Sequence, residues 1–325
     1  MLYREALNKA LDEFMEKDES VVILGEDVGF YGGSYRVTEG LYGKYGAHRA
    51  IDTPIAENSI VGNAIGMAIG GLRPVAEIMT VNFALIAIDQ IINHAAKLRY
   101  MSGGKMTIPL VVRMPQGVAK QLAAQHSQSF ERLFSSVPGL KTFVATDATT
   151  AYYGLKYAIA VDDPVIFLEH ELLYPEEVEF QEQEAFSPYV ARVMKEGDGI
   201  TIVSYLKMYH DTMEAVPTIE KELGVSCEVI QLCSLNPLDI NTLVKSVQKT
   251  GRFAIVTEEP KTGSYAAEVC AKISEEAFYN LDAPPLRICA EDVPTPYNRT
   301  LELASIPTPD KIASKITEWG KKHGI

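Results

Sequence analysis

The chain has 325 residues, of which 47% are hydrophobic and 22% charged, and its formal net charge is -13 at pH 7. A chain of this length is expected to form about two domains, and it can bury a core without disulfides or a structural metal. The ordinary composition excludes a disordered or collagen-like chain, and the acidic balance argues against a nonspecific nucleic-acid binder, because DNA phosphates would be repelled.

Short apolar runs alternate with helical stretches along the first half of the chain. Residues 1–15 form an amphipathic pattern with mixed charges, which predicts a helix and not a signal peptide. Asp147 is a typical N-cap for a helix over residues 148–161. Runs typical of buried strands lie at residues 21–24, 74–79, 109–114, 143–146 and 165–168. This alternation predicts a parallel sheet with helices on both faces.

The composition changes at residues 174–188, which are acidic and polar and show no periodicity. We interpret this stretch as a connection between domains. The alternation then resumes, with expected strands at residues 200–205, 227–232, 253–257 and 286–290 and expected helices at 264–280 and 311–322. The chain is therefore predicted to be an α/β protein with one domain over residues 1–180 and a smaller one over residues 190–325.

Three glycines, Gly62, Gly66 and Gly70, line one face of a predicted helix. Each costs about 1 kcal/mol relative to alanine in a helix, so a close backbone approach is expected in compensation. We favour a tight helix contact between subunits; the alternative is a buried helix packed within its own chain. No run of 18 apolar residues occurs, so no membrane span is expected.

Several generic signatures do not apply. The stretch at residues 25–33 is glycine-rich but is not GxGxxG, residues 102–105 lack the spacing of a phosphate-binding loop, and no HExxH occurs. Gly197-Asp198-Gly199 is not followed by paired asparagines and precedes a strand, so we expect a turn there and not a magnesium site. The four cysteines form no CxxC pair, which indicates buried reduced thiols.

Two local constellations remain as candidate sites. Glu57 follows a proline-directed extended stretch and precedes the glycine-rich helix; if buried, it must be paired or have a raised pKa. The alternative is an ordinary first-turn acid that offsets the helix dipole. His126 lies in a loop-like stretch among small and amide residues, which could orient its ring toward a cleft. The alternative is a surface histidine.

Taken together, five segments resemble the beta subunit of the pyruvate dehydrogenase decarboxylase component, within the thiamine-diphosphate-dependent 2-oxo acid dehydrogenases. They are TPIAEN, GLRPVAEIMTVNFALIAIDQIINHAAKLRYMSGG, AAQHSQ, DDPVIFLEHELLY and EDVPTPYN. The resemblance covers nearly the whole chain in order, and GFYGGSYRVTEGLY looks most like the cyanobacterial and plastid branch. It implies a pyrimidine-binding domain followed by a transketolase C-terminal domain.

The resemblance also implies a mechanism. Glu57 matches the glutamate that hydrogen-bonds a pyrimidine ring nitrogen of the cofactor, which activates the thiazolium carbon for attack on pyruvate; the cofactor then acts as the electron sink. His126 matches a histidine that positions substrate or lipoyl and relays a proton during acetyl transfer. Phe83, Met79 and Ile55 match an apolar wall beside the pyrimidine, although ordinary core packing is nearly as good an interpretation of Phe83.

By the same resemblance, the active form is an α2β2 heterotetramer whose alpha subunit holds the diphosphate and magnesium, so this chain alone should be inactive. Lipoyl groups of a dihydrolipoamide acetyltransferase would accept the acetyl group on its way to acetyl-CoA. A structural potassium ion would bind mainly to backbone carbonyls, and the matching positions are Leu110, Ala158, Ile159 and Asp163.

Two other functions remain open, namely a branched-chain 2-oxo acid dehydrogenase beta subunit and a noncatalytic scaffold for the alpha subunit. Neither nucleic acid nor membrane is expected as a partner. The expected location is the bacterial cytoplasm, or the plastid stroma if the chain is plastid-encoded.

Overall fold

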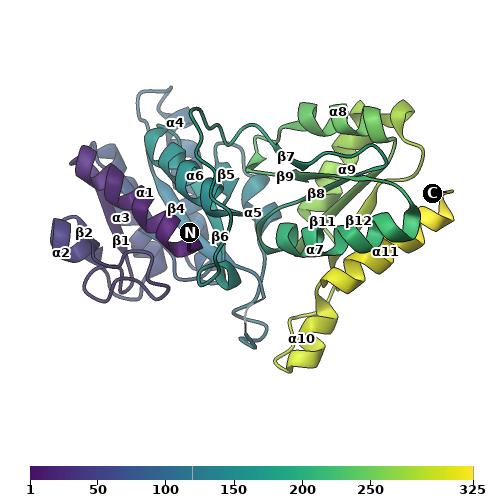
Figure 1. Cartoon of the computed structure of the whole chain (residues 1–325). Coiled ribbons are helices and arrows are strands. Elements are labelled where there is room, and N and C mark those ends of the chain that lie inside the picture. The colour runs from purple at the N-terminus through teal and green to yellow at the C-terminus, as the bar shows by residue number, and fades with distance from the viewer. Residues whose placement is uncertain (119, 325) are drawn as a thin grey trace. The chain divides into compact units, whose positions relative to one another are not determined.

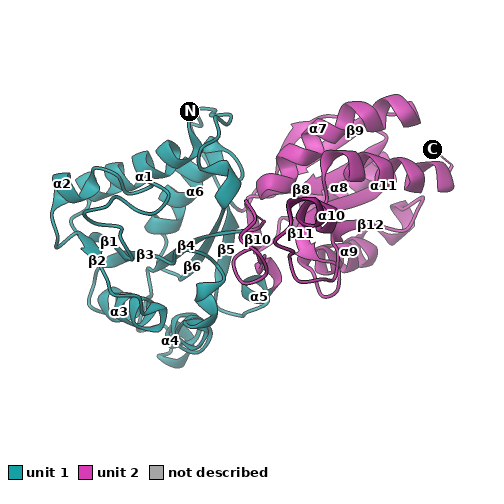
Figure 2. Ribbon diagram, turned by 90° about the horizontal axis from the view of Figure 1, so that it is seen from below, with its two compact units in different colours: residues 1–116, 133–188 teal, residues 117–132, 189–325 magenta. Residues whose placement is uncertain are grey.

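The computed structural model describes residues 1–118 and 120–324. The chain divides into two compact units (Figure 2). Unit 1 comprises residues 1–116 and 133–188, and unit 2 comprises residues 117–132 and 189–325. The sequence placed residues 117–132 in the first domain, whereas in the structure this segment clusters with the second.

The strands of unit 1 run in the order β5-β6-β4-β3-β1-β2, and every pair among them is parallel. Their bounds are Val21–Gly25 (β1), Ala50–Asp52 (β2), Arg73–Glu77 (β3), Val111–Gln116 (β4), Lys141–Val144 (β5) and Val165–His170 (β6). Strands β1, β4 and β6 are buried along their whole length, as expected where helices cover both faces of a parallel sheet.

Helices α1 (Tyr3–Lys17) and α6 (Ala148–Ala160) pack against each other (Figure 1). The Tyr3 hydroxyl donates a buried hydrogen bond to the carbonyl of Ala145 at 2.6 Å. The predicted N-cap of α6 is confirmed, because Asp147 accepts the backbone N–H of Thr150 at 2.7 Å. The other helical segments of this unit are α2 (Leu41–Tyr45), α3 (Glu57–Ile69), η1 (Phe83–Leu85), η2 (Gln90–Ala95), α4 (Ala96–Met101) and η3 (Glu171–Leu173), and α5 (Glu131–Ser135) spans a unit boundary.

Unit 2 contains a second sheet, ordered β12-β11-β8-β9-β7. Its strands are Arg192–Lys195 (β7), Ile200–Ser204 (β8), Cys227–Gln231 (β9), Phe253–Pro260 (β11) and Leu286–Ala290 (β12), and Ser234–Asn236 is β10. All pairs in this sheet are parallel except β7 with β9, which is antiparallel. The sequence did not predict the edge strand β7, which alternates between exposed and half-buried residues and lacks an apolar run.

The helical segments of unit 2 are α7 (Leu206–Leu223), α8 (Ile240–Thr250), α9 (Tyr265–Glu276), η4 (Phe278–Asn280), α10 (Arg299–Ser305) and α11 (Pro309–Lys322). The predicted helix over residues 264–280 is thus α9 followed by a separate 3₁₀ turn. Helices α7 and α11 pack together, and both contribute to a core that includes Ile219, Val229 and Ile316. The two-domain α/β fold with parallel-rich sheets is therefore confirmed.

The acidic stretch over residues 174–188 contains no helix or strand, as expected for a connection. It nevertheless lies against unit 1, because the N–H of Tyr3 donates to the Glu176 carbonyl at 3.0 Å and that of Ala148 to the Glu179 carbonyl at 3.1 Å. Within the described residues, no helix is both long and apolar enough to cross a membrane.

Candidate active site

The carboxyl ends of three neighbouring strands meet at one edge of the sheet in unit 1. Gly25 at the end of β1 is aligned with Asp52 of β2 on one side and Glu77 of β3 on the other. Gly25 has to be glycine, since a Cβ there would lie 2.7 Å from the carbonyl oxygen of Glu77. Ligands of parallel α/β sheets bind at this edge.

Glu57 is the first residue of α3 and is buried, with 4% of its surface exposed. The chain reaches it directly from β2, and the N–H of Thr53 donates to the Gly25 carbonyl at 3.0 Å, which ties this stretch to the end of β1. Among residues 1–118 and 120–324, the Glu57 carboxylate has no hydrogen bond or ion pair. A buried carboxylate in this state is costly, and a ligand that supplies a hydrogen-bond partner would offset that cost.

Sequence reasoning missed a second carboxyl group at this place, Glu26, which directly follows β1. Glu26 is buried, and its Oε1 atom has no hydrogen-bond partner among the described residues. Burial raises the pKa of Glu26, and the negative charges of Glu57, Asp27 and Glu77 raise it further. Because such interactions weaken with distance, Glu26 and Glu57 lie close enough to influence each other. The available signal was an acid at the carboxyl end of an apolar strand.

A buried ion cluster lies beside this pair. Arg113 of β4 is 1% exposed; its Nε donates to Glu169 of β6 at 2.8 Å, and its Nη1 pairs with Glu77. The Tyr174 hydroxyl donates to the other oxygen of Glu169 at 2.6 Å. Burial alone would lower the pKa of Arg113, but the charges of Glu169 and Glu77 raise it overall. Charged residues inside otherwise apolar strands were the signal for this cluster in the sequence.

The proposed apolar wall is spread over three positions of unit 1. Met79 lies two residues after the end of β3, and Phe83 begins η1, where its N–H donates to the Thr80 carbonyl at 3.0 Å; both side chains are half-buried. Ile55 precedes Glu57 by two residues and is 82% exposed. Exposure of this degree is not that of a core residue and leaves Ile55 accessible to another molecule.

His126 is exposed and belongs to unit 2, whereas Glu57 belongs to unit 1. Its backbone N–H donates to the carbonyl of Ala123 at 3.2 Å. Ala123 has a φ of 65°, in the left-handed region that residues with a side chain rarely adopt. The histidine therefore follows a tight local turn.

The four potassium candidates all lie in unit 1. The Leu110 carbonyl accepts the N–H of Val165 at 2.8 Å, and the Ile159 carbonyl accepts Nη1 of Arg73 at 2.9 Å. A carbonyl has two lone pairs, so each keeps one for a cation. Burial would raise the pKa of Asp163, but hydrogen bonds and charge from Lys141 and Arg99 lower it overall. Because Lys141 and Arg99 already bind the Asp163 side chain, an ion would be held by the backbone oxygen of Asp163. Ala158 can likewise offer only its backbone oxygen.

The glycine-bearing face of α3 is only partly covered by the described residues of its own chain. A Cβ built on Gly62 would meet only the Gln90 side chain, at 3.5 Å, and one on Gly66 would meet no described atom within 4 Å. Gly66 and Gly70 are both exposed. Packing within the chain therefore does not explain the three glycines, and contact with another subunit remains the expectation.

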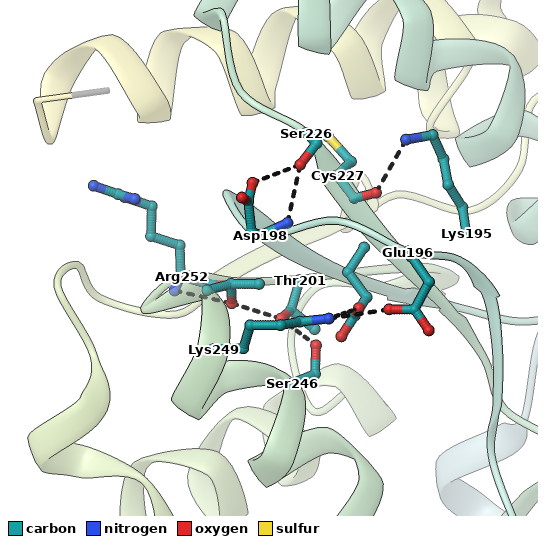
Figure 3. Close-up of polar contacts among 11 residues, drawn as sticks. Lys195, Glu196, Asp198, Thr201, Ser226, Cys227, Ser246, Lys249 and Arg252 are labelled. Carbon is teal, nitrogen blue, oxygen red and sulfur yellow. Dashed lines mark hydrogen bonds and ion pairs between the residues drawn. The ribbon is translucent and has the colours of Figure 1, made fainter.

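The Gly197-Asp198-Gly199 triplet is a structural bend before β8, as predicted. Figure 3 shows Asp198 and Ser226 in contact: the backbone N–H of Asp198 donates to the Ser226 hydroxyl at 2.9 Å, and that hydroxyl donates to the Asp198 carboxylate at 2.6 Å. A Cβ on Gly197 would lie 2.3 Å from the Cys227 backbone. Across the residues that the structure describes, no group of three or more His, Cys, Asp or Glu side chains could hold a metal ion.

The four cysteines are free, as predicted from their spacing. Three of them, Cys227, Cys233 and Cys289, are buried, and Cys270 is partly exposed. Burial raises the pKa of the Cys227 thiol to about 12, with a further contribution from the charge of Glu220. Burial and the raised pKa disfavour the reactive thiolate form of Cys227.

Comparison with known proteins agrees with this fold. Residues 1–177 match the family described as transketolase, pyrimidine binding domain, and residues 190–312 match transketolase, C-terminal domain. A solved structure titled "Split gene transketolase, inactive beta4 tetramer" has a TM-score of 0.80 at 24% identity, over 99% of this chain and 98% of its own. A transketolase from Campylobacter jejuni has a TM-score of 0.72 at 14% identity, over 97% of this chain and 46% of its own. These two structures show a shared fold.

Curated relatives give a finer assignment. The pyruvate dehydrogenase E1 component subunit beta of Porphyra purpurea is 48% identical over 96% of this chain and 94% of its own length. The protein of the same name from Gracilaria tenuistipitata var. liui is 47% identical over 97% and 98%. The mitochondrial one of Saccharomyces cerevisiae is 42% identical over 98% and 88%. With such identity over nearly the full length, the chain belongs to the family of pyruvate dehydrogenase E1 component beta subunits, built from a transketolase pyrimidine-binding domain and a transketolase C-terminal domain.

Proposed function

We propose that this chain acts as the beta subunit of pyruvate dehydrogenase (acetyl-transferring), in the thiamine-diphosphate-dependent decarboxylation of pyruvate with acetylation of lipoyl groups. The observation that carries the proposal is Glu57, a buried carboxyl at the carboxyl edge of a parallel sheet with no partner in the described chain. The membership of the chain in the family of pyruvate dehydrogenase E1 component beta subunits supports the choice of reaction. Bound thiamine diphosphate supplies a nucleophilic carbon and an electron sink.

The residues of the site fit this cofactor. Glu57 offers a shielded oxygen for a hydrogen bond to a pyrimidine ring nitrogen, and burial excludes the water that would compete for that bond. Burial and the charge of Glu57 raise the pKa of Glu26, so the two neighbouring carboxyl groups are not readily ionised together. Phe83, Met79 and Ile55 would present apolar surface to the ring, and Ile55 is exposed enough to do so.

The alpha subunit is the proposed partner, in an α2β2 heterotetramer in which it holds the diphosphate and magnesium. Unit 1 exposes large apolar side chains that a partner chain could cover, among them Phe30 (86%), Ile55 (82%), Ile86 (61%) and Tyr100 (89%). Two of these, Phe30 and Ile55, flank Asp52, whose carboxylate accepts the N–H of Phe30 at 3.1 Å. Exposed apolar surface of this kind commonly marks a protein interface. Unit 2 would contribute to docking of the acetyltransferase.

The assembled complex provides the test of function. Purified chain and alpha subunit should release carbon dioxide from pyruvate only when thiamine diphosphate and magnesium are both present, and neither subunit should do so alone. Faster turnover of 3-methyl-2-oxobutanoate than of pyruvate would assign the chain to branched-chain substrates. No turnover of either substrate would support a noncatalytic scaffold.

For His126 we propose a role at the reactive end of the cofactor, in positioning lipoyl and relaying a proton during acetyl transfer. His126→Ala should lower lipoyl acetylation about 10²-fold or more, in the range of general acid–base catalysis, with the tetramer intact. The measurements are acetylation of a lipoyl domain and sedimentation of the complex. The exposed His48 of the same chain offers a matched control, since His48→Ala should leave both unchanged. Dissociation of the His126→Ala complex would instead identify a structural histidine.

We also propose a structural potassium ion held by the backbone carbonyls of Leu110, Ala158, Ile159 and Asp163. In potassium chloride, the thermal midpoint of unfolding should exceed that in choline chloride of equal ionic strength by roughly 2–4 °C for each kcal/mol of binding. Asp163→Asn should retain the difference, because it keeps the backbone oxygen. Identical midpoints of the wild-type chain in the two salts would exclude the ion.

A further inference from the structure

Residues 117–132, which carry His126, cluster with unit 2 (Figure 2), and three glutamates of that unit accept backbone N–H groups from them. The backbone N–H of Val118 donates to Glu258 at 2.5 Å, that of Gln121 to Glu302 at 2.9 Å, and that of Arg132 to Glu259 at 2.7 Å. All three carboxylates are buried, with 7%, 0% and 4% of their residues' surface exposed. They hold the segment near both of its ends and at one point between them.

The segment is strained at the middle attachment. Gln121 has a φ of 63° and Ala123 a φ of 65°, both in the left-handed region. Such conformations persist only where surrounding contacts compensate for them. The N–H that Glu302 accepts belongs to Gln121 itself, and the Gln121 side chain also donates to the Tyr297 carbonyl at 3.3 Å. Glu302 therefore stabilises Gln121 in its left-handed conformation.

A pocket lies beside the segment within unit 2. Its volume is about 520 Å³, and its lining includes Val118 and Phe130 from the segment and Pro294 and Ile306 from the rest of the unit. The Thr295 hydroxyl donates to the carbonyl of Ser127, the residue after His126, at 3.3 Å. Polar contacts thus contribute to the position of the segment, and hydrogen bonds to carboxylates are the strong kind.

Glu302 is itself fixed in place. It lies on α10, whose N-terminus is capped by the Asn298 side chain, which accepts the N–H of Thr300 at 3.0 Å. Its second oxygen pairs with Arg299 at 2.5 Å. One oxygen of the Glu302 carboxylate therefore pairs with Arg299 of its own helix, and the other accepts the N–H of Gln121 in the segment.

We propose that Glu302, with Glu258 and Glu259, is a positioning residue for lipoyl acetylation: it acts through the backbone of residues 117–132 and sets where His126 is held. This inference rests on the proposed function of His126. It assigns the C-terminal unit a part in the reaction through the backbone of this segment.

The test uses the reconstituted complex with Glu302→Ala, Glu302→Gln and, as a matched control, Glu228→Ala. Glu228 is also buried, at 2%, and is paired with Lys249, and it has no contact with the described residues of the segment. Segment release is measured by trypsin cleavage after the exposed Lys120 and by hydrogen exchange of peptides spanning residues 120–132. Function is measured as kcat and KM for lipoyl-domain acetylation.

For Glu302→Ala we expect cleavage after Lys120 to accelerate about tenfold and kcat to fall by a similar factor, with KM for pyruvate unchanged, since one charge-assisted hydrogen bond is lost. Glu302→Gln retains an acceptor oxygen and should restore most of both losses. Glu228→Ala should lower the thermal midpoint without accelerating cleavage. A merely structural role for Glu302 would lower the midpoint and leave kcat of the folded complex unchanged.

Unchanged cleavage in Glu302→Ala would overturn the inference, and so would faster cleavage with wild-type kcat. Failure of the proposed function is distinguishable, because the wild-type complex would then already lack lipoyl acetylation. If Glu302→Ala does not fold, Glu302→Asp draws the carboxylate back from Gln121 while keeping its charge. It should then give an intermediate increase in cleavage, and wild-type protection would likewise overturn the inference.

Discussion

Glu57→Gln in the reconstituted complex is expected to lower pyruvate decarboxylation by about 10²–10⁴-fold, the range of general acid–base catalysis. The amide keeps the size of the side chain but cannot supply the carboxyl group proposed at the pyrimidine ring nitrogen. Because Glu57 has no hydrogen-bond partner among the described residues, the substitution breaks no contact within the chain. The loss should therefore appear in kcat for carbon dioxide release, with assembly intact and no decrease in the thermal midpoint.

The matched control for Glu57→Gln is Asp310→Asn, which removes an exposed acid from the first turn of α11. If Glu57 merely offset the helix dipole, the two variants would behave alike, with small losses of stability and full activity. Wild-type turnover by Glu57→Gln would end the catalytic interpretation and favour a scaffold.

The largest effect on stability is expected for Arg113→Met. Removing the guanidinium leaves the carboxylates of Glu77 and Glu169 buried without their cation, which typically costs about 3–5 kcal/mol. The measurement is denaturant-induced unfolding of the chain, from which the midpoint of the transition that includes unit 1 is determined. Arg99→Met is the matched control, because its ion pair with Asp163 is largely exposed and should contribute at most about 1 kcal/mol.

The pH dependence of Arg113→Met gives a second readout. Burial raises the pKa of Glu77, Arg113 lowers it, and Glu169 raises it. Without Arg113 the folded-state pKa of Glu77 rises further above its unfolded value, so stability is retained at low pH and lost as the pH rises through the folded pKa. The variant should be closer to wild type at pH 5 than at pH 8. A loss that is independent of pH would indicate packing, and not charge, as the cause.

The main strands could be predicted because parallel strands buried on both faces leave an apolar run in the sequence. Strands β1, β4, β6, β8 and β11 were found in this way. Three short strands were not predicted, namely β2 and β10 with three residues each and β7 at the edge of its sheet, because none of them is buried throughout. The spacing of apolar residues indicates which residues are buried, and it gives no signal where a strand is short or half-exposed.

The candidate site was only partly predictable. Glu57 could be singled out by its place before a glycine-rich helix, whereas for Glu26 and Arg113 the sequence offered only a charged residue at or within an apolar strand, which does not tell which charges meet. Their surroundings are created by strand neighbours: Gly25 lies beside Glu77, and Arg113 lies beside Phe167 of β6. Register between strands far apart in sequence decides which charges meet, and no local pattern encodes it.

By itself, the sequence determined the α/β class, the alternation of helices and strands, and the family. The spacing of apolar residues and the recognisable segments are local features of the chain, so they can be found without knowledge of tertiary contacts. Tertiary structure alone decided that residues 117–132 join unit 2, since the glutamates that hold them lie 127 to 181 residues further on. It also decided that Glu57 is buried where its charge acts on Glu26 and that Gly66 and Gly70 of α3 are exposed. Such facts depend on long-range contacts, whose identity follows only from the folded chain.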